Sequence, residues 1–354
     1  MAGMTKTLRC ALVLCLLTPR SPGAAQGTAY HTDSRADLHS VVFVSAQVGL
    51  AVGADGTILR TTTGGQHWAA VNSTTTVTLH KVTQAPGGAL YAVGDFGLIL
   101  QSRDQGLSWR QLVSGAKQQL QGVHFPSAST GYAVGAYGTM LRTTNHGRSW
   151  QRLPSGGERT FSAVQFPTRR VGYLVLAGSA QYLKTRNAGR TWTEGRLPAD
   201  LQAHLSGPLL FRDAKRGLLL GGSRPRGSEH PDGLDHGSAA VYRTRDGGRT
   251  WAQQHVPGNV SMAVCFGSCS TGYLLVKQYV GSLRPGYTSR NASATESTIV
   301  QREMLVLRTV DAGATWHLQG RLVPPQLPYC FDVACPTPAS CVLVGEKGQT
   351  YAYP

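Results

Sequence analysis

The sequence has few acidic residues, few aromatic residues and few helix-forming patterns. Asp and Glu total 18 against 34 Lys and Arg, and aromatic residues make up 8% of the 354 residues. Because basic residues outnumber acidic ones, the sequence excludes an acidic surface. Its positive net charge suits acidic partners instead. Because helical patterns are scarce while Gly, Thr, Val and Tyr are abundant, the composition favours β structure.

Long apolar runs are also missing. The apolar run at residues 10–17 is too short to span a bilayer. Basic residues precede it and small residues suited to cleavage follow at positions 23–25, which is the pattern of a signal peptide. We therefore predict a signal peptide at residues 1–25 and a mature chain at residues 26–354. The mature chain would have no transmembrane segment and would be periplasmic or secreted.

The charge of the mature chain indicates its partners. It would keep 31 basic against 18 acidic residues, a net charge of about +13. A field of this sign attracts acidic molecules. We expect a monomer that binds an acidic protein or envelope partner and no specific nucleic acid. A basic surface that binds nothing is the alternative.

The chain repeats one unit, of which GYAVGAYGTMLRTTNHGRSW at residues 131–150 is a clear copy. All six tryptophans close such units, at spacings of 41, 41, 42, 59 and 65 residues. This period, with four short apolar runs separated by turn residues, is typical of a four-stranded propeller blade. We therefore predict an all-β chain that forms a single seven-bladed β-propeller.

The seventh copy of the unit is incomplete. It reads CVLVGEKGQTYAYP and reaches residue 354 without a tryptophan or a fourth strand. The segment at residues 28–33 could supply that strand. Pairing of the N- and C-terminal strands would then close the ring and leave no long free edge.

The turn before each tryptophan follows the pattern Ser/Thr-x-Asp-x-Gly-x-x-Trp. A short acceptor side chain can bind the N–H groups of the turn, glycine can adopt a positive φ, and the indole can be buried between strands. The pattern resembles the Asp-box, or bacterial neuraminidase repeat, which has a structural role in its families. The residues concerned are Asp104, Asn145, Asn187, Asp246 and Asp311, with Trp68, Trp109, Trp150, Trp192, Trp251 and Trp316.

Units of the form GYAVGxxGTILRTTxxGxxW behind an export signal resemble the photosystem II stability/assembly factor family and its relatives in non-photosynthetic bacteria. The resemblance covers nearly all of the mature chain. It implies a non-enzymatic scaffold without cofactors, which uses a basic patch to hold a membrane-protein intermediate during assembly.

The alternative function is that of a carbohydrate-active propeller, either a sialidase-like glycosidase or a lectin-like binder. Sialidases share the Asp-box, but they also need a tyrosine paired with a glutamate, and none of the six glutamates here lies beside a tyrosine in an evident strand. Asp55, Asp95 and Glu346 occupy corresponding turns of three consecutive blades and could form a carboxylate or cation site. We interpret them as turn residues, and predict no catalytic residue and no metal.

Two sets of basic residues are candidates for binding a partner. Blades five and six have greatly extended turns between their second and third strands, and long loops on a rigid scaffold often serve recognition. Their candidates are Arg224, Arg226, Arg284 and Arg290. The second set occupies one position of the third strand and should spread around the rim, where it could contact an acidic partner or simply be solvated. It comprises Arg60, Arg142, Lys184, Arg243 and Arg308.

Five cysteines remain in the mature chain, all in the last two blades. This suggests local disulfides in an oxidising compartment. We predict a bond between Cys335 and Cys341, at the two ends of a tight strand connection. A second bond would join Cys265 to Cys269, or either of them to Cys330, and one thiol would stay unpaired. A metal site is the alternative.

Overall fold

The computed structural model describes residues 28–30, 32, 34–177, 179, 181–196, 203–204, 209–223, 238–280, 301–322 and 330–353. The predicted signal peptide and the four loop arginines, Arg224, Arg226, Arg284 and Arg290, lie outside these residues. In the part of the chain that is described, no helix has the length and apolar character needed to cross a membrane.

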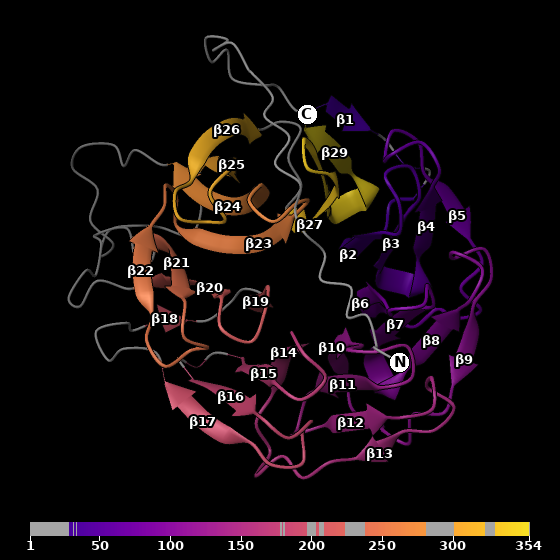
Figure 1. Cartoon of the computed structure of the whole chain (residues 1–354). Helices are drawn as coiled ribbons and strands as arrows, with labels where there is room; N and C mark the ends of the chain where they lie inside the picture. Colours follow the sequence, from indigo (N-terminus) through magenta and orange to yellow (C-terminus); the bar gives the residue numbers. More distant parts are fainter. Residues whose placement is uncertain are drawn as a thin grey trace, which may run out of the picture.

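Short apolar runs, each ended by glycine or polar turn residues, form antiparallel blades arranged in a ring (Figure 1). Blade 1 comprises β2 (Leu38–Phe43), β3 (Gly49–Gly53), β4 (Ile58–Thr61) and β5 (Ala69–Val71). Blade 2 comprises β6 (Leu79–Gln84), β7 (Leu90–Gly94), β8 (Ile99–Ser102) and β9 (Arg110–Leu112). Blade 3 comprises β10 (Leu120–His124), β11 (Gly131–Gly135), β12 (Met140–Thr143) and β13 (Gln151–Arg152).

The second half of the chain continues the ring. Blade 4 comprises β14 (Phe161–Gln165), β15 (Gly172–Leu176), β16 (Gln181–Thr185) and β17 (Thr193–Arg196). Blade 5 comprises β18 (Ala203–His204), β19 (Leu209–Phe211), β20 (Gly217–Ser223), β21 (Ser238–Thr244) and β22 (Ala252–His255), with β18 and β19 both paired to β20. Blade 6 comprises β23 (Val260–Phe266), β24 (Gly272–Val280), β25 (Gln301–Thr309) and β26 (His317–Leu322).

Blade 7 is assembled from both ends of the chain. It comprises β27 (Cys330–Thr337), β28 (Ser340–Gly345), β29 (Thr350–Tyr353) and β1 (Thr28–Tyr30). β1 pairs with β29 in antiparallel register, with Thr28 opposite Ala352, and Figure 1 shows the indigo strand beside the yellow blade. The predicted seven-bladed propeller and its closure by terminal strands are therefore confirmed.

The alternating strand directions distribute the connections over two faces of the ring. Turns between first and second strands, and between third and fourth strands, lie on one face, which we call the tryptophan-turn face. Turns between second and third strands lie on the other face, which we call the η face. It includes the 3-10 segments η1 (Ala54–Gly56), η2 (Asp95–Gly97) and η3 (Glu346–Gly348).

Aromatic side chains fill the interfaces between blades. Tyr91 of blade 2 stacks on Phe125 of blade 3, with ring centroids 3.9 Å apart. Gly131 lies directly under the same ring, where a β-carbon would come within 2.4 Å of Phe125, so this position requires glycine. Each stacked ring buries a large apolar area and fixes one blade against the next. The stacking recurs as Tyr132–Phe166 and Tyr173–Phe211.

The turn before each tryptophan is held by hydrogen bonds to two of its side chains. In blade 2, Ser102 Oγ accepts the N–H of Gly106 at 2.9 Å, and Asp104 Oδ1 accepts the N–H of Ser108 at 3.0 Å. The hydrogen bonds from Ser108 lower the pKa of Asp104 to about 2. Trp109 then packs in a buried cluster with side chains of blade 1. The turn therefore stabilises both its own hairpin and the seam with the preceding blade.

The disulfide differs from the predicted pairs. Cys265 of β23 bonds to Cys335 of β27, with an S–S distance of 2.08 Å and Cα atoms 5.9 Å apart. The predictions of Cys335–Cys341 and Cys265–Cys269 bonds are therefore wrong. First strands of successive blades lie against each other, so Cys335 faces blade 6, whereas Cys341 is buried on the second strand of its own blade.

The second predicted disulfide does not form among the described cysteines. Cys330 and Cys341 are buried thiols, and Cys269 is exposed. Burial raises the pKa of Cys330 to about 12 and also raises that of Cys341. Since the thiolate is the reactive and metal-binding form, both buried thiols are suited to packing rather than chemistry.

Candidate partner-binding surface

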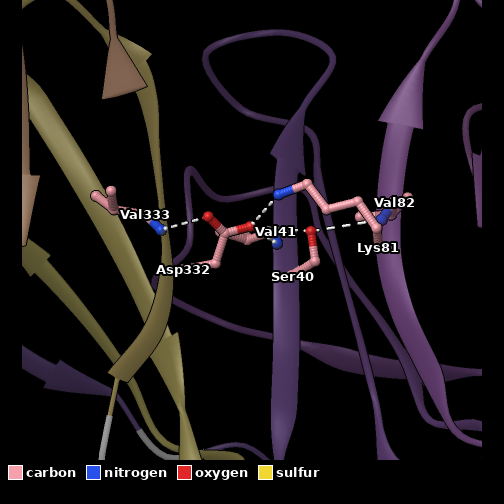
Figure 2. Close-up of polar contacts among 6 residues, drawn as sticks. All are labelled: Ser40, Val41, Lys81, Val82, Asp332 and Val333. Atoms are coloured by element: carbon pink, nitrogen blue, oxygen red, sulfur yellow. Dashed lines mark hydrogen bonds and ion pairs between the residues drawn. The ribbon is translucent and has the colours of Figure 1, made fainter. Parts of the chain in front are cut away.

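Asp332 of β27, the first strand of blade 7, joins the first strands of blades 1 and 2 (Figure 2). Asp332 Oδ2 accepts hydrogen bonds from Ser40 Oγ at 2.9 Å and the Val41 N–H at 3.2 Å, and it pairs with Lys81 Nζ at 2.9 Å. Oδ1 accepts the N–H of Val333 at 3.0 Å. Both oxygens are thus engaged, and the carboxylate joins blades 7, 1 and 2.

A second group of polar side chains comes from β2, β6, η2 and the residue before β10. His80 Nε2 lies 2.8 Å from Asp95 Oδ1 and 2.8 Å from Gln119 Nε2. The His80 ring stacks on His39, with centroids 5.6 Å apart. Asp95 therefore contacts a histidine of its own blade. It does not form a site with Asp55 and Glu346, the acidic residues in the corresponding turns of blades 1 and 7. Among the described residues, no group of three His, Cys, Asp or Glu could hold a metal ion.

The basic series of the third strands lies in the seams between blades. All five side chains are half-buried, and several contact the next blade. Arg60 Nε donates to the Gln105 carbonyl at 3.0 Å, and Lys184 Nζ donates to the Gly247 carbonyl. Cations also lie over tyrosine rings of their own blades, as Arg142–Tyr132, Lys184–Tyr173 and Arg308–Tyr273, at 6.0, 5.2 and 5.9 Å from the centroids. Such contacts stabilise the propeller.

Two of these tyrosines, Tyr132 and Tyr173, fix turns of the following blade. Tyr132 Oη donates to the Ala188 carbonyl at 2.8 Å, and Tyr173 Oη donates to the Gly247 carbonyl at 3.1 Å. Exposed side chains on these turns are therefore presented from an anchored backbone. This matters most for blades 4 and 5, whose turns carry many charges.

Eight exposed cations gather on the tryptophan-turn face of blades 4 and 5. The two turns of blade 4 are joined by a hydrogen bond from the Ala188 N–H to the Arg170 carbonyl at 2.9 Å, and those of blade 5 by one from the Gly247 N–H to the Lys215 carbonyl at 2.7 Å. We call this surface the basic face. Its members are Arg169, Arg170, Arg186, Arg190, Lys215, Arg216, Arg245 and Arg249.

Few acidic side chains among the described residues neutralise the cations of the basic face. Of its eight cations, only Arg216 forms an ion pair within the described chain, with Asp213 at 2.7 Å. The Asp246 carboxylate accepts hydrogen bonds from the N–H and the hydroxyl of Thr250, at 2.9 and 2.7 Å. Burial lowers the pKa of Lys184, and the nearby cations Arg186 and Arg249 lower it further. An anion placed there would meet a positive potential that the described residues leave largely unneutralised.

The same positions in other blades show that this charge is local. The corresponding turns of blades 1, 6 and 7, at residues 44–48, 62–67, 267–271, 310–315 and 336–339, contain no Lys or Arg and are fully described. Blades 2 and 3 contribute one arginine each, Arg103 and Arg148. Because these turns share one fold, their backbone conformation cannot account for eight cations on two adjacent blades. The eight cations therefore belong to the surface of blades 4 and 5 and are not needed to form the turns.

Sequence reasoning missed the basic face. It followed one strand position and the inserted loops, whereas the cations lie on four separate turns. A signal was present in the dipeptides Arg169-Arg170 and Lys215-Arg216, which occupy the first turn of two successive blades. Their significance depends on knowing that both turns of a blade emerge on one face.

No known protein-family model matches the sequence, and no curated protein matches it significantly. Solved structures nevertheless share its fold. A structure of YCF48 bound to D1 peptide superposes with a TM-score of 0.65 at 16% identity, covering 94% of this chain and 98% of that one. YCF48 from Cyanidioschyzon merolae gives 0.64 at 15% identity, covering 93% and 98%. The predicted resemblance to photosystem II assembly-factor propellers is confirmed at the level of the fold.

A glycosidase shares the same architecture. The GH74 enzyme of Niastella koreensis superposes with a TM-score of 0.64 at 13% identity and covers 92% of this chain. Only 53% of the enzyme is matched, so the chain spans about half its length. The propeller fold is thus shared by a peptide-bound protein and an enzyme, and the fold alone does not separate their functions.

Proposed function

We propose that this chain is an exported, non-enzymatic scaffold that binds an acidic segment of a protein partner through the basic face. The observation that carries the proposal is the concentration of eight exposed cations on blades 4 and 5, on turns that are otherwise free of Lys and Arg in blades 1, 6 and 7. Export fits the disulfide between Cys265 and Cys335, since such bonds persist in oxidising compartments.

The chemistry of the basic face suits carboxylates. Seven of its eight cations are arginines, whose planar guanidinium groups bind carboxylates through two parallel hydrogen bonds. The turns that carry them are anchored to the neighbouring blade, which reduces the entropy lost on binding. The structure of YCF48 with a D1 peptide supports the proposal, because it shows a propeller of this fold with a peptide bound.

The bonding of Asp332 and Asp95 favours this function over a glycosidase. Hydrolysis needs a carboxylate that is free to accept or donate a proton at the substrate. Asp332 and Asp95 are instead bonded to side chains of neighbouring strands. The carbohydrate-active alternative rests on the fold shared with the GH74 enzyme. Glycosidase activity that disappeared in the Asp95→Asn variant would support it.

Affinity capture from the native envelope tests the scaffold function. The test variant replaces Arg169, Arg170, Arg186 and Arg190 by glutamine. The control variant makes the same change in net charge elsewhere, at Arg35, Arg103, Arg152 and Lys347, which are all exposed. We expect a partner that is captured by the wild type and the control, released by moderate salt and lost by the test variant. Capture that is equally strong with both variants would refute the assignment of this surface.

A further inference from the structure

Two aromatic residues on the η face have a backbone conformation that is unfavourable for bulky residues. They occupy the third position of the Gly-x-x-Gly turn, where φ is +55° at Phe96 and +50° at Tyr137. Bulky side chains are disfavoured in this left-handed region, which suits glycine, asparagine and aspartate. The same position in blade 1 holds Asp55, with φ of +53°, so the turn itself accepts a more compatible residue.

These aromatic rings contribute little to the core. Phe96 is 77% exposed and Tyr137 is 66% exposed. Between their turns runs the segment 113–119, which starts with Val113, itself 84% exposed. We call Phe96, Val113 and Tyr137 the aromatic patch. Large apolar side chains that are exposed on one face of a protein commonly mark a binding site.

Hydrogen bonds hold both aromatic turns against the same short segment. Ser114 Oγ donates to the Gly97 carbonyl at 2.6 Å, which fixes the start of the segment against the Phe96 turn. At the other end, the Ala136 N–H donates to the Gln119 carbonyl at 3.0 Å, beside Tyr137. Both aromatic turns therefore border one short segment on a rigid backbone.

We propose that the aromatic patch is a second docking surface, which takes an apolar stretch of a protein partner with an acidic residue next to it. This inference rests on the proposed scaffold function and adds a site on the opposite face. Aromatic anchors dominate protein interfaces because they bury a large area at a small entropic cost. The exposed Lys117, the one charged residue of segment 113–119, would pair with the acidic residue.

A protein segment fits this surface better than a saccharide does. Sugar recognition pairs aromatic stacking with free polar groups that bind hydroxyls. Here Asp95, the polar side chain next to Phe96, is already engaged by His80, whose Nε2 lies 2.8 Å from Asp95 Oδ1. Apolar side chains need no such partners, so the patch is matched to them.

Peptide selection on the full chain tests the proposal. A random library of peptides of about ten residues, which span roughly 33 Å when extended, is selected on the wild-type protein. We expect enriched peptides with two large apolar residues and one acidic residue. Their binding should fall at least tenfold in the F96N/Y137N double variant, which removes both anchors. Leu107→Asn is the control, because Leu107 is 62% exposed on the opposite face.

Thermal unfolding of the same variants provides the second readout. Asparagine tolerates positive φ, so F96N and Y137N should leave the melting temperature unchanged or raise it by up to about 3 °C. A lower melting temperature would mean that the rings stabilise the fold, and would overturn the proposal. So would enriched peptides that bind F96N/Y137N as well as the wild type, oligosaccharide binding that this variant loses, or a homodimer that it abolishes.

The two proposed surfaces can fail separately. Neutralising Arg169, Arg170, Arg186 and Arg190 should leave the selected apolar peptides bound, because these arginines lie on the tryptophan-turn face. If that variant keeps its envelope partner while F96N/Y137N loses the peptides, the basic face is wrong and the aromatic patch stands. If the selected peptides are purely acidic and are lost with the arginines, the aromatic patch is wrong.

Discussion

Lys81 Nζ lies 2.9 Å from Asp332 Oδ2, so an ion pair joins blades 2 and 7 although blade 1 lies between them. The same oxygen accepts hydrogen bonds from Ser40 and Val41 of blade 1. Three blades therefore meet at one carboxylate, which lies on β27, at the edge of blade 7 opposite the strand from the N-terminus (Figures 1 and 2).

The two partners of this ion pair should differ in their importance for stability. Asp332→Ala removes the acceptor of Ser40 and of the Val41 and Val333 N–H groups, and we expect it to cost about 3 kcal/mol in the free energy of unfolding. Lys81→Met should cost about 1 kcal/mol or less, because the Lys81 side chain is 40% exposed. Urea unfolding at neutral pH measures both. Equal losses would contradict the view of Asp332 as the shared acceptor.

Stability should also depend on the protonation of His124. Burial lowers the pKa of His124 to about 4, and its Nδ1 accepts the N–H of Phe166 at 3.2 Å. Between pH 6.5 and 4 the unfolded chain binds a proton that the folded chain excludes, so stability falls as the pH falls. We expect the wild type to lose about 2 kcal/mol more than His124→Gln between pH 7 and pH 5. Identical losses in urea unfolding would show that His124 is readily protonated in the fold.

The disulfide should contribute strongly to stability, because it links residues that are 70 positions apart. The chain-entropy relation gives about 4 kcal/mol for a loop of this length. We expect that loss in the Cys265→Ser/Cys335→Ser double variant, and a change within about 0.5 kcal/mol in the exposed control Cys269→Ser. Peptide mapping without reductant should recover residues 265 and 335 in one cross-linked fragment. A fragment joining residues 335 and 341 would contradict this pairing.

The repeats provide a matched comparison for the turn aspartates. Asn145 Oδ1 accepts the Ser149 N–H at 3.0 Å, just as Asp104 accepts that of Ser108. We therefore expect Asp104→Asn to cost less than about 0.5 kcal/mol and Asp104→Ala to cost about 1 kcal/mol at pH 7.

The charge of Asp104 adds a pH dependence to this comparison. Its pKa of about 2 lies below the unfolded value, so its contribution is present above pH 4 and is lost as the pH falls toward 2. Unfolding at pH 7 and pH 3 should show a smaller acid loss for Asp104→Asn than for the wild type. If both lose the same stability, the charge of Asp104 has no role in the turn.

Much of the fold could be predicted from the sequence because it repeats. The tryptophan spacing and the Gly-rich turns depend on neighbours within one blade, so each copy carries the same local information. The disulfide could not be predicted in this way, because the Cys265–Cys335 bond crosses from one blade to the next. For the same reason the partner of Lys184 could not be predicted, because its Nζ donates to the Gly247 carbonyl of the next blade.

The propeller, its seven blades and the pairing of its terminal strands could be predicted from periodic patterns in the chain. Which charges meet depends instead on how the blades are arranged in space. Arg169, Arg190, Lys215 and Arg249 are far apart in sequence, and they form one surface because both turns of a blade emerge on the same face and adjacent blades lie side by side. Phe96 and Tyr137 became a candidate site for the same reason, since the turns that carry them border one segment between two blades.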